Sequence, residues 1–217
     1  PLSNQSAQAR AKYYGANGAP TIYLDGERNK PGEGLKTEAE SVFRNLDASI
    51  GTRLEAPARA RIKIDATLEG KSLKVIATVD GIQAPPSDLK VQLALVEEQV
   101  SYSGENGLRF HPMVVRNMGG PTADAYGFPI AGTQTEKVEH VFDLEQITAA
   151  NLKYYDDYIA EMTKRLGGRA EISFKEKRYL IDRDKLAVVA FVQDEKTKEV
   201  LQATYVKVAP AVSQSGR

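Results

Sequence analysis

Alternation of apolar and polar residues dominates the chain from about residue 60 onward. Apolar residues occupy every second position over 62–68, and the same alternation returns over 73–79 and 89–95. Successive side chains of a strand point to opposite faces, so each run presents one apolar and one polar face. Antiparallel sheets that are packed on one side have this pattern. The sequence therefore predicts an antiparallel β-sandwich.

The remainder of this region predicts further strands and one helix. Strands are expected over 109–116 and 136–143, separated by a Gly- and Pro-containing loop at 117–133, and a hairpin is expected from 186–193 and 200–208. Apolar residues at helical spacing predict one amphipathic helix packed on the sandwich: Leu152, Tyr155, Ile159, Met162 and Leu166.

The first 51 residues follow a different pattern. A helix ending at Gly15 is expected to precede a short strand at 21–24, which the turn signal Asp25-Gly26 joins to a second strand. Thr37 and Glu40 have the spacing of a capping box, which predicts a helix over about 37–50 that ends at Gly51. The apolar residues of this helix fall on one face: Ala39, Val42, Phe43, Leu46 and Ile50.

These patterns together predict a mainly β protein with an α+β N-terminal part. We expect an α-β-β-α part at 1–51, a linker at 52–57, a β-sandwich with one helix at 58–209 and a flexible tail at 210–217. The chain begins with Pro1 rather than Met, which predicts that an upstream segment has been removed.

Composition restricts the chemistry. The chain has no cysteine, so disulfides, thiolate zinc sites, cysteine nucleophiles and dithiol redox centres are excluded within its residues. The 29 basic and 29 acidic side chains cancel, so no global charge favours nucleic acid. No apolar run approaches the length of a membrane span. We expect no cofactor and no metal.

The N-terminal residues carry a resemblance. The segment Ala11-Lys12-Tyr13-Tyr14-Gly15, followed by Gly18-Ala19-Pro20-Thr21-Ile22-Tyr23-Leu24-Asp25-Gly26-Glu27, resembles the second half of a thioredoxin domain. The resemblance implies that the Ala19–Pro20 bond is cis, that Pro20 is the proline that lies against the redox dithiol in that family, and that Ala19 presents its backbone to an extended peptide. It also implies an incomplete thioredoxin-like fold, because the segments that precede this half are not among these residues.

A second resemblance covers most of residues 60–208. The segments 93–98, 104–107, 110–116 and 189–203 look like the C-terminal domain of bacterial secreted or outer-membrane thioredoxin-like proteins. This resemblance implies an immunoglobulin-like sandwich and an extracytoplasmic location, which is periplasmic, secreted or outer-membrane associated.

Candidate site residues are few. His111 and Arg116 are five residues apart on one expected strand, so a regular strand would point them to opposite faces. Arg116 could bind a carboxylate or phosphate ligand. Alternatively, His111 bonds to a loop carbonyl and Arg116 pairs with a carboxylate at the sandwich edge. His140, beside Glu139 and Asp143, could ligate a metal or belong to a solvated surface strand.

Tyr126 and Phe128 mark the expected loop as a partner-binding candidate, because aromatic residues on long loops often serve recognition. The function we expect is a non-enzymatic interaction or structural module of an exported bacterial protein. Its partner would be another protein, the missing thioredoxin half or a second copy. One alternative is a fragment of a thiol–disulfide oxidoreductase whose dithiol lies upstream, and another is a lectin-like or adhesive module.

Overall fold

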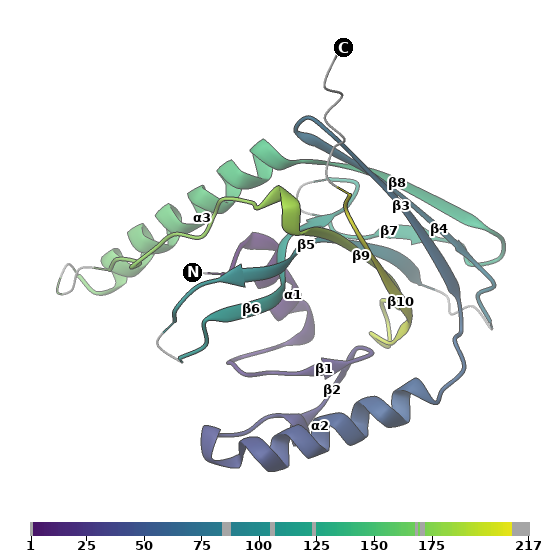
Figure 1. Cartoon of the computed structure of the whole chain (residues 1–217), viewed down its shortest axis with the longest axis horizontal. Helices are drawn as coiled ribbons and strands as arrows, with labels where there is room; N and C mark the ends of the chain where they lie inside the picture. Colours follow the sequence, from purple (N-terminus) through teal and green to yellow (C-terminus); the bar gives the residue numbers. More distant parts are fainter. Residues whose placement is uncertain are drawn as a thin grey trace.

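Two antiparallel sheets that face each other form the body of the molecule (Figure 1). The structure, a computed structural model, describes residues 2–83, 88–104, 107–122, 125–167, 169 and 172–209. The smaller sheet has the order β3-β4-β8: β3 Arg61–Glu69, β4 Ser72–Asp80 and β8 Glu136–Asp143. The larger has the order β10-β9-β5-β6: β10 Val200–Lys207, β9 Leu186–Asp194, β5 Leu89–Ser101 and β6 Phe110–Gly119.

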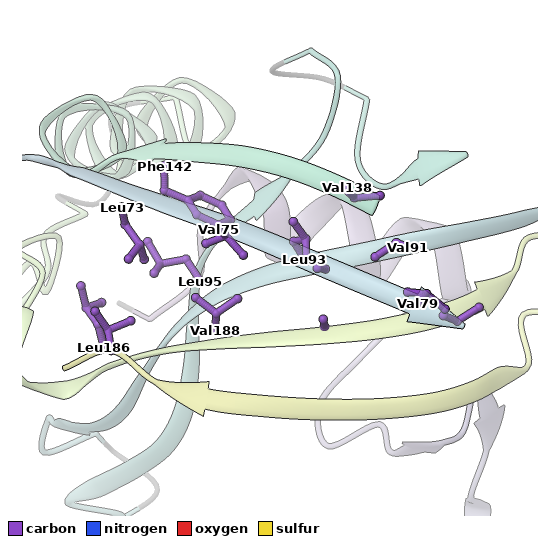
Figure 2. Packing of buried hydrophobic residues seen from close by; sticks show 14 of the residues in the cluster. Leu73, Val75, Val79, Val91, Leu93, Leu95, Val138, Phe142, Leu186 and Val188 are labelled. Atoms are coloured by element: carbon purple, nitrogen blue, oxygen red, sulfur yellow. The ribbon is translucent and has the colours of Figure 1, made fainter. Parts of the chain in front are cut away.

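The core lies between the two sheets. Every second residue of β4 points inward and is fully buried, from Leu73 to Val79, and it meets the inward residues of β5 and β9 (Figure 2). Leu93, Leu95 and Val188 are likewise inaccessible to solvent. The period-two alternation therefore predicted both the strands and their buried faces correctly, and the fold is mainly β with a helical part.

The predicted loop at 117–133 is much shorter than expected. β6 continues to Gly119, and a short strand β7, Phe128–Ile130, pairs with the start of β5. A Cβ atom at Gly120 would lie 1.7 Å from the carbonyl oxygen of Ala125, so the connection folds back tightly on itself. Backbone pairing with β5, which the local sequence does not reveal, converts this segment from a loop into part of the sheet.

The N-terminal part has the predicted order of elements but different helix ends. It consists of α1 Gln5–Tyr14, β1 Tyr23–Leu24, β2 Glu27–Arg28, two short 3₁₀ turns at Lys30–Gly32 and Lys36–Glu38, and α2 Ala39–Leu54. The capping box does not form, because Glu38 rather than Glu40 reaches back and accepts a hydrogen bond from the backbone amide of Leu35 at 2.9 Å. Gly51 does not end α2, which continues to Leu54 and therefore occupies half of the predicted linker.

The second long helix, α3 Leu144–Arg165, begins eight residues before the apolar stripe that predicted it. Asp143 ends β8 and caps α3, since its carboxylate accepts hydrogen bonds from the amides of Glu145 and Gln146, both at 3.0 Å. Tyr155 is buried, whereas the C-terminal half of α3 extends away from the sheets (Figure 1). A third 3₁₀ turn, Arg183–Lys185, leads into β9. None of the described helices is long and apolar enough to cross a membrane.

Candidate functional site

The N-terminal part is attached to the sandwich by a polar network around Tyr14. The Tyr14 hydroxyl accepts hydrogen bonds from Arg10 and from Gln193 of β9, both at 2.7 Å. The Gln193 amide also donates to the carbonyl of Lys198, and the Lys198 ammonium donates to the carbonyl of Tyr13. Burial is the main reason that the pKa of Tyr13 rises to about 12. Residues 10–14 are therefore fixed on the β9–β10 hairpin.

The start of α1 covers the edge of β6. Asn4 caps α1 and donates to the carbonyls of Val115 and Arg116, at 2.7 and 3.3 Å. The Ser6 hydroxyl accepts a hydrogen bond from the amide of Met118 at 3.1 Å. An uncovered edge strand offers a row of unpaired backbone groups to other chains. Here Asn4 and Ser6 occupy three of those groups, at Val115, Arg116 and Met118, so this part of the edge is protected.

The hairpin β1–β2 lies against the start of β10. Its turn residues Asp25 and Gly26 both have positive φ, the geometry of a two-residue type I′ turn. The carbonyl of Asp25 accepts a hydrogen bond from the amide of Val200 at 2.9 Å. The Ala19–Pro20 bond just before the hairpin is cis, the isomer that the thioredoxin resemblance implies, and both residues are exposed.

An apolar stripe on α2 is left uncovered. Phe43, Ile50 and Leu54 lie one above the other on the helix, and their side chains are 68%, 40% and 79% exposed. No residue of α2 is fully buried. Val42 and Leu46 instead face the loop that follows β2, where they approach Gly34 and Gly32. The sequence predicts one apolar face for all these residues, whereas the structure turns Val42 and Leu46 toward the loop and leaves Phe43 and Ile50 exposed.

A groove continues from this stripe toward the edge strand β10. It has a volume of about 590 Å³ and lies between the C-terminal end of α2, residues 56–59 and the start of β10. Ile50, Leu54 and Leu24 contribute apolar surface, opposite Val200 and Ala203. β10 pairs with β9 on one side only, so its other side is an edge of the larger sheet.

Charged side chains at the rim of the groove are paired with one another. Arg53 contacts Asp25 and Glu27, at 3.4 and 2.9 Å, and Arg59 contacts Glu199 at 2.7 Å. These pairs neutralise the rim. The groove therefore combines an apolar floor, a sheet edge and no strong net charge.

Arg116 and His111 do not form a joint site. Arg116 is 2% exposed, its Nε lies 2.9 Å from Oε2 of the buried Glu97, and its terminal nitrogen donates to the carbonyls of Arg178 and Leu180. Burial raises the pKa of Glu97. This group binds the segment after α3 to the larger sheet and leaves no open position for a ligand.

His111 instead contacts the carbonyl of Tyr102 across the β5–β6 hairpin, with 3.0 Å between its Nε2 and that oxygen. Phe128 packs on the main core between the sheets, whereas Tyr126 packs on a smaller apolar cluster on the outer face of the larger sheet. The four residues predicted for partner binding therefore lie in three separate places. Only Tyr126 and Phe128 are near one another.

His140 does not belong to a solvated face of its strand, because it points into the sandwich. Val138, His140 and Phe142 share the inner face of β8, and the imidazole is half-buried between the rings of Phe128 and Phe142. The inward orientation of His140 was predictable from the sequence, because residues 138, 140 and 142 alternate with the outward residues of β8. Among the described residues, no group of three or more His, Asp or Glu side chains could hold a metal ion.

No protein-family profile and no curated protein sequence matches the chain. Among solved structures, the chain is similar to a domain of the outer membrane lipoprotein Omp28 from Porphyromonas gingivalis, with 16% identity and a TM-score of 0.37, over 71% of this chain and 92% of that one. It is also similar to a structural-genomics protein from Agrobacterium tumefaciens, with 11% identity and a TM-score of 0.48, over 97% of this chain and 73% of that one. These are likenesses of fold, and they assign no activity.

Proposed function

We propose that this chain is a non-enzymatic protein-binding module that accepts an extended, apolar polypeptide segment in the groove between α2 and β10. The observation that carries the proposal is the exposed stripe of Phe43, Ile50 and Leu54, which runs into that groove. Contiguous exposed apolar surface with a polar rim is typical of protein interaction sites.

The edge of β10 favours an extended occupant over a helix. A peptide can add to an open sheet edge as a further strand, with main-chain hydrogen bonds for affinity and alternate side chains in apolar pockets. The Val200 amide is already engaged by the carbonyl of Asp25, so the open part of the edge begins beyond it. There the Ala203 amide donates to its neighbour Gln202 at 2.9 Å rather than to another strand. A bound strand would displace the Gln202 side chain and place apolar residues against Ile50 and Leu54.

The paired rim favours a segment of low net charge. Arg53 and Arg59 are already engaged with acidic partners, so a strongly acidic peptide would gain no free cation at the rim. We place the module in an exported bacterial protein of thioredoxin-like kind. This part of the proposal rests on the resemblance of the N-terminal α-β-β-α part and of residues 93–116 and 189–203.

A peptide selection tests the proposal. A phage-displayed peptide library is selected on the purified chain alone, and the enriched peptides are then measured for binding to the double variant Ile50→Asp/Leu54→Asp. We expect enriched peptides with alternating apolar residues, whose binding shifts the backbone resonances of residues 200–203. The matched control is Leu180→Asp, since Leu180 is 68% exposed but lies on the segment beside α3. Peptides that bind wild type and Ile50→Asp/Leu54→Asp equally would rule the groove out.

A further inference from the structure

A second pocket, separate from the groove between α2 and β10, lies beside the start of α1. It has a volume of about 410 Å³ and opens where the start of α1, the end of β6, the turn before β7, the end of β8 and the first turns of α3 meet. Pockets of roughly 300–1,000 Å³ are the usual size for small-molecule ligands. Five elements from distant parts of the sequence therefore converge on a ligand-sized space.

His140 is the most unusual group in this pocket. Its ring lies 4.5 Å from the ring of Phe142 and 5.6 Å from that of Phe128, measured between centroids. It also packs on Gly119, where a Cβ atom would come within 2.9 Å of the ring. Within the described part of the chain, its nitrogens have no hydrogen-bond partner. Because burial lowers the pKa of His140, the imidazole is neutral at pH 7 and offers one donor and one acceptor.

Two further polar groups of the pocket are unengaged by the described residues. The Asn117 side-chain amide and the Tyr126 hydroxyl are both half-buried at the wall, and neither forms a hydrogen bond with a described side chain or backbone group. An amide and a phenol, like a neutral imidazole, each combine donor and acceptor capacity. Groups of this kind bond to water in the free protein and can exchange that water for a ligand.

The pocket carries almost no formal charge. Asp143 is the one charged residue among the described residues that line it, and one carboxylate oxygen of Asp143 caps α3. No lysine or arginine is present at its described wall to bind an anion. Pro121, Val141 and Ala150 are exposed and add apolar surface to the wall. The wall therefore suits a neutral ligand that has both hydroxyl groups and an apolar face.

We propose that this pocket binds a neutral sugar residue. Sugar hydroxyls donate and accept at once, which matches the mixed capacity of Asn117, Tyr126 and His140. The carbon–hydrogen face of a sugar ring matches the apolar part of the wall. The site is distinct from the α2–β10 groove, so the proposal stands or fails independently of the protein-binding function.

The test is an NMR titration of the ¹⁵N-labelled full chain with glucose, galactose, mannose and N-acetylglucosamine, each to about 50 mM, because single sugar residues bind weakly. We expect at least one sugar to shift resonances at the end of β6, the end of β8 and the start of α3. Asn117→Ala and Tyr126→Phe should weaken that binding about five- to tenfold, the effect of one lost hydrogen bond. Tyr102→Phe, on the β5–β6 hairpin, is the matched control and should bind as wild type does.

Several results would overturn the sugar site. They are the absence of localised shifts with all four sugars, shifts that Asn117→Ala and Tyr126→Phe leave unchanged, and tighter binding of inorganic phosphate or glucuronate at the same residues. Thermal unfolding of each variant, measured beforehand, separates a lost hydrogen bond from a lost fold.

Discussion

Arg116 and Glu97 show what a buried charge requires at the scale of single residues. Their side chains are 3% and 4% exposed. Nη2 of Arg116 donates to the carbonyls of Arg178 and Leu180, and Oε1 of Glu97 accepts from the amide of Asp182. A buried ion pair contributes little net stability when intact, but removing one partner leaves an uncompensated charge in a medium that solvates it poorly.

Arg116→Met is expected to lower the free energy of unfolding by about 3–5 kcal/mol, because the Glu97 carboxylate then lacks its counter-ion. Urea denaturation measures the loss. The double variant Glu97→Leu/Arg116→Met should lose less than the sum of the single variants, since neither charge remains. Glu98→Gln is the control: Glu98 pairs with Lys207 at the surface, and its loss should change stability little. Equal losses in Arg116→Met and Glu98→Gln would contradict this account.

His140 makes a pH-dependent contribution to stability. Because burial lowers its pKa below 6.5, the unfolded chain takes up this proton before the folded chain as pH falls. The contribution is fully present above about pH 6.5 and is lost as pH falls through the folded pKa. The stability difference between about pH 7.5 and pH 5 should therefore be larger in wild type than in His140→Phe. Parallel pH profiles of unfolding free energy in the two proteins would refute the assignment.

At the scale of elements, the hairpin β1–β2 depends on one close approach. Gly26 has φ +88°, and a Cβ atom there would lie 1.7 Å from the carbonyl oxygen of Lys198. The local sequence Asp25-Gly26 predicts the turn, since both residues need positive φ. The contact with Lys198 adds a second requirement for glycine, which follows only from how the hairpin is placed on β10.

Gly26→Ala should therefore loosen the hairpin from the sandwich. We expect faster hydrogen exchange in β1, in β2 and at Val200, together with a loss of unfolding free energy. Gly70→Ala is a matched control, because Gly70 also has positive φ, +56°, but a Cβ atom there would meet nothing within 4 Å. Both variants place an alanine at positive φ and lose unfolding free energy for that reason. The additional loss in Gly26→Ala therefore measures the clash with the carbonyl of Lys198. No excess would show that the approach to Lys198 is unimportant.

At the scale of the whole molecule, the sandwich has its own core and the N-terminal part protects it. The members of the main buried cluster all lie between Ala60 and Val208. Residues 2–54 contribute side chains that cover the β6 edge instead, through Asn4 and Ser6. Removal of these residues should leave a folded sandwich with an exposed edge strand.

A chain that begins at residue 55 is therefore expected to keep its β-sheet circular dichroism signal and to associate, because the carbonyls of Val115 and Arg116 and the amide of Met118 become available for strand pairing. Light scattering after size-exclusion chromatography measures the association, with the full chain at the same concentration as the control. A folded, strictly monomeric product would show that α1 is not needed to protect this edge.

The candidate sites were less predictable than the strands. Phe43 and Ile50 were correctly assigned to one face of a helix, but sequence periodicity cannot say whether another element covers that face. His140 shares the inward parity of Val138 and Phe142, so its orientation could have been predicted from alternation alone. Its lack of hydrogen-bond partners among the described residues could not have been predicted in this way, because Gly119 and Phe128 contact it from other strands.

The antiparallel strands, the order of the N-terminal elements and the absence of thiol chemistry all follow from the amino-acid sequence. These properties depend on side-chain alternation, turn residues and residue types, all of which are local. Which surfaces are covered depends on contacts between distant residues, since Asn4 and Val115 are 111 residues apart and Tyr14 and Gln193 are 179 apart. The groove beside α2 and the pocket around His140 lie where such distant elements meet, and for that physical reason neither could be predicted from local pattern.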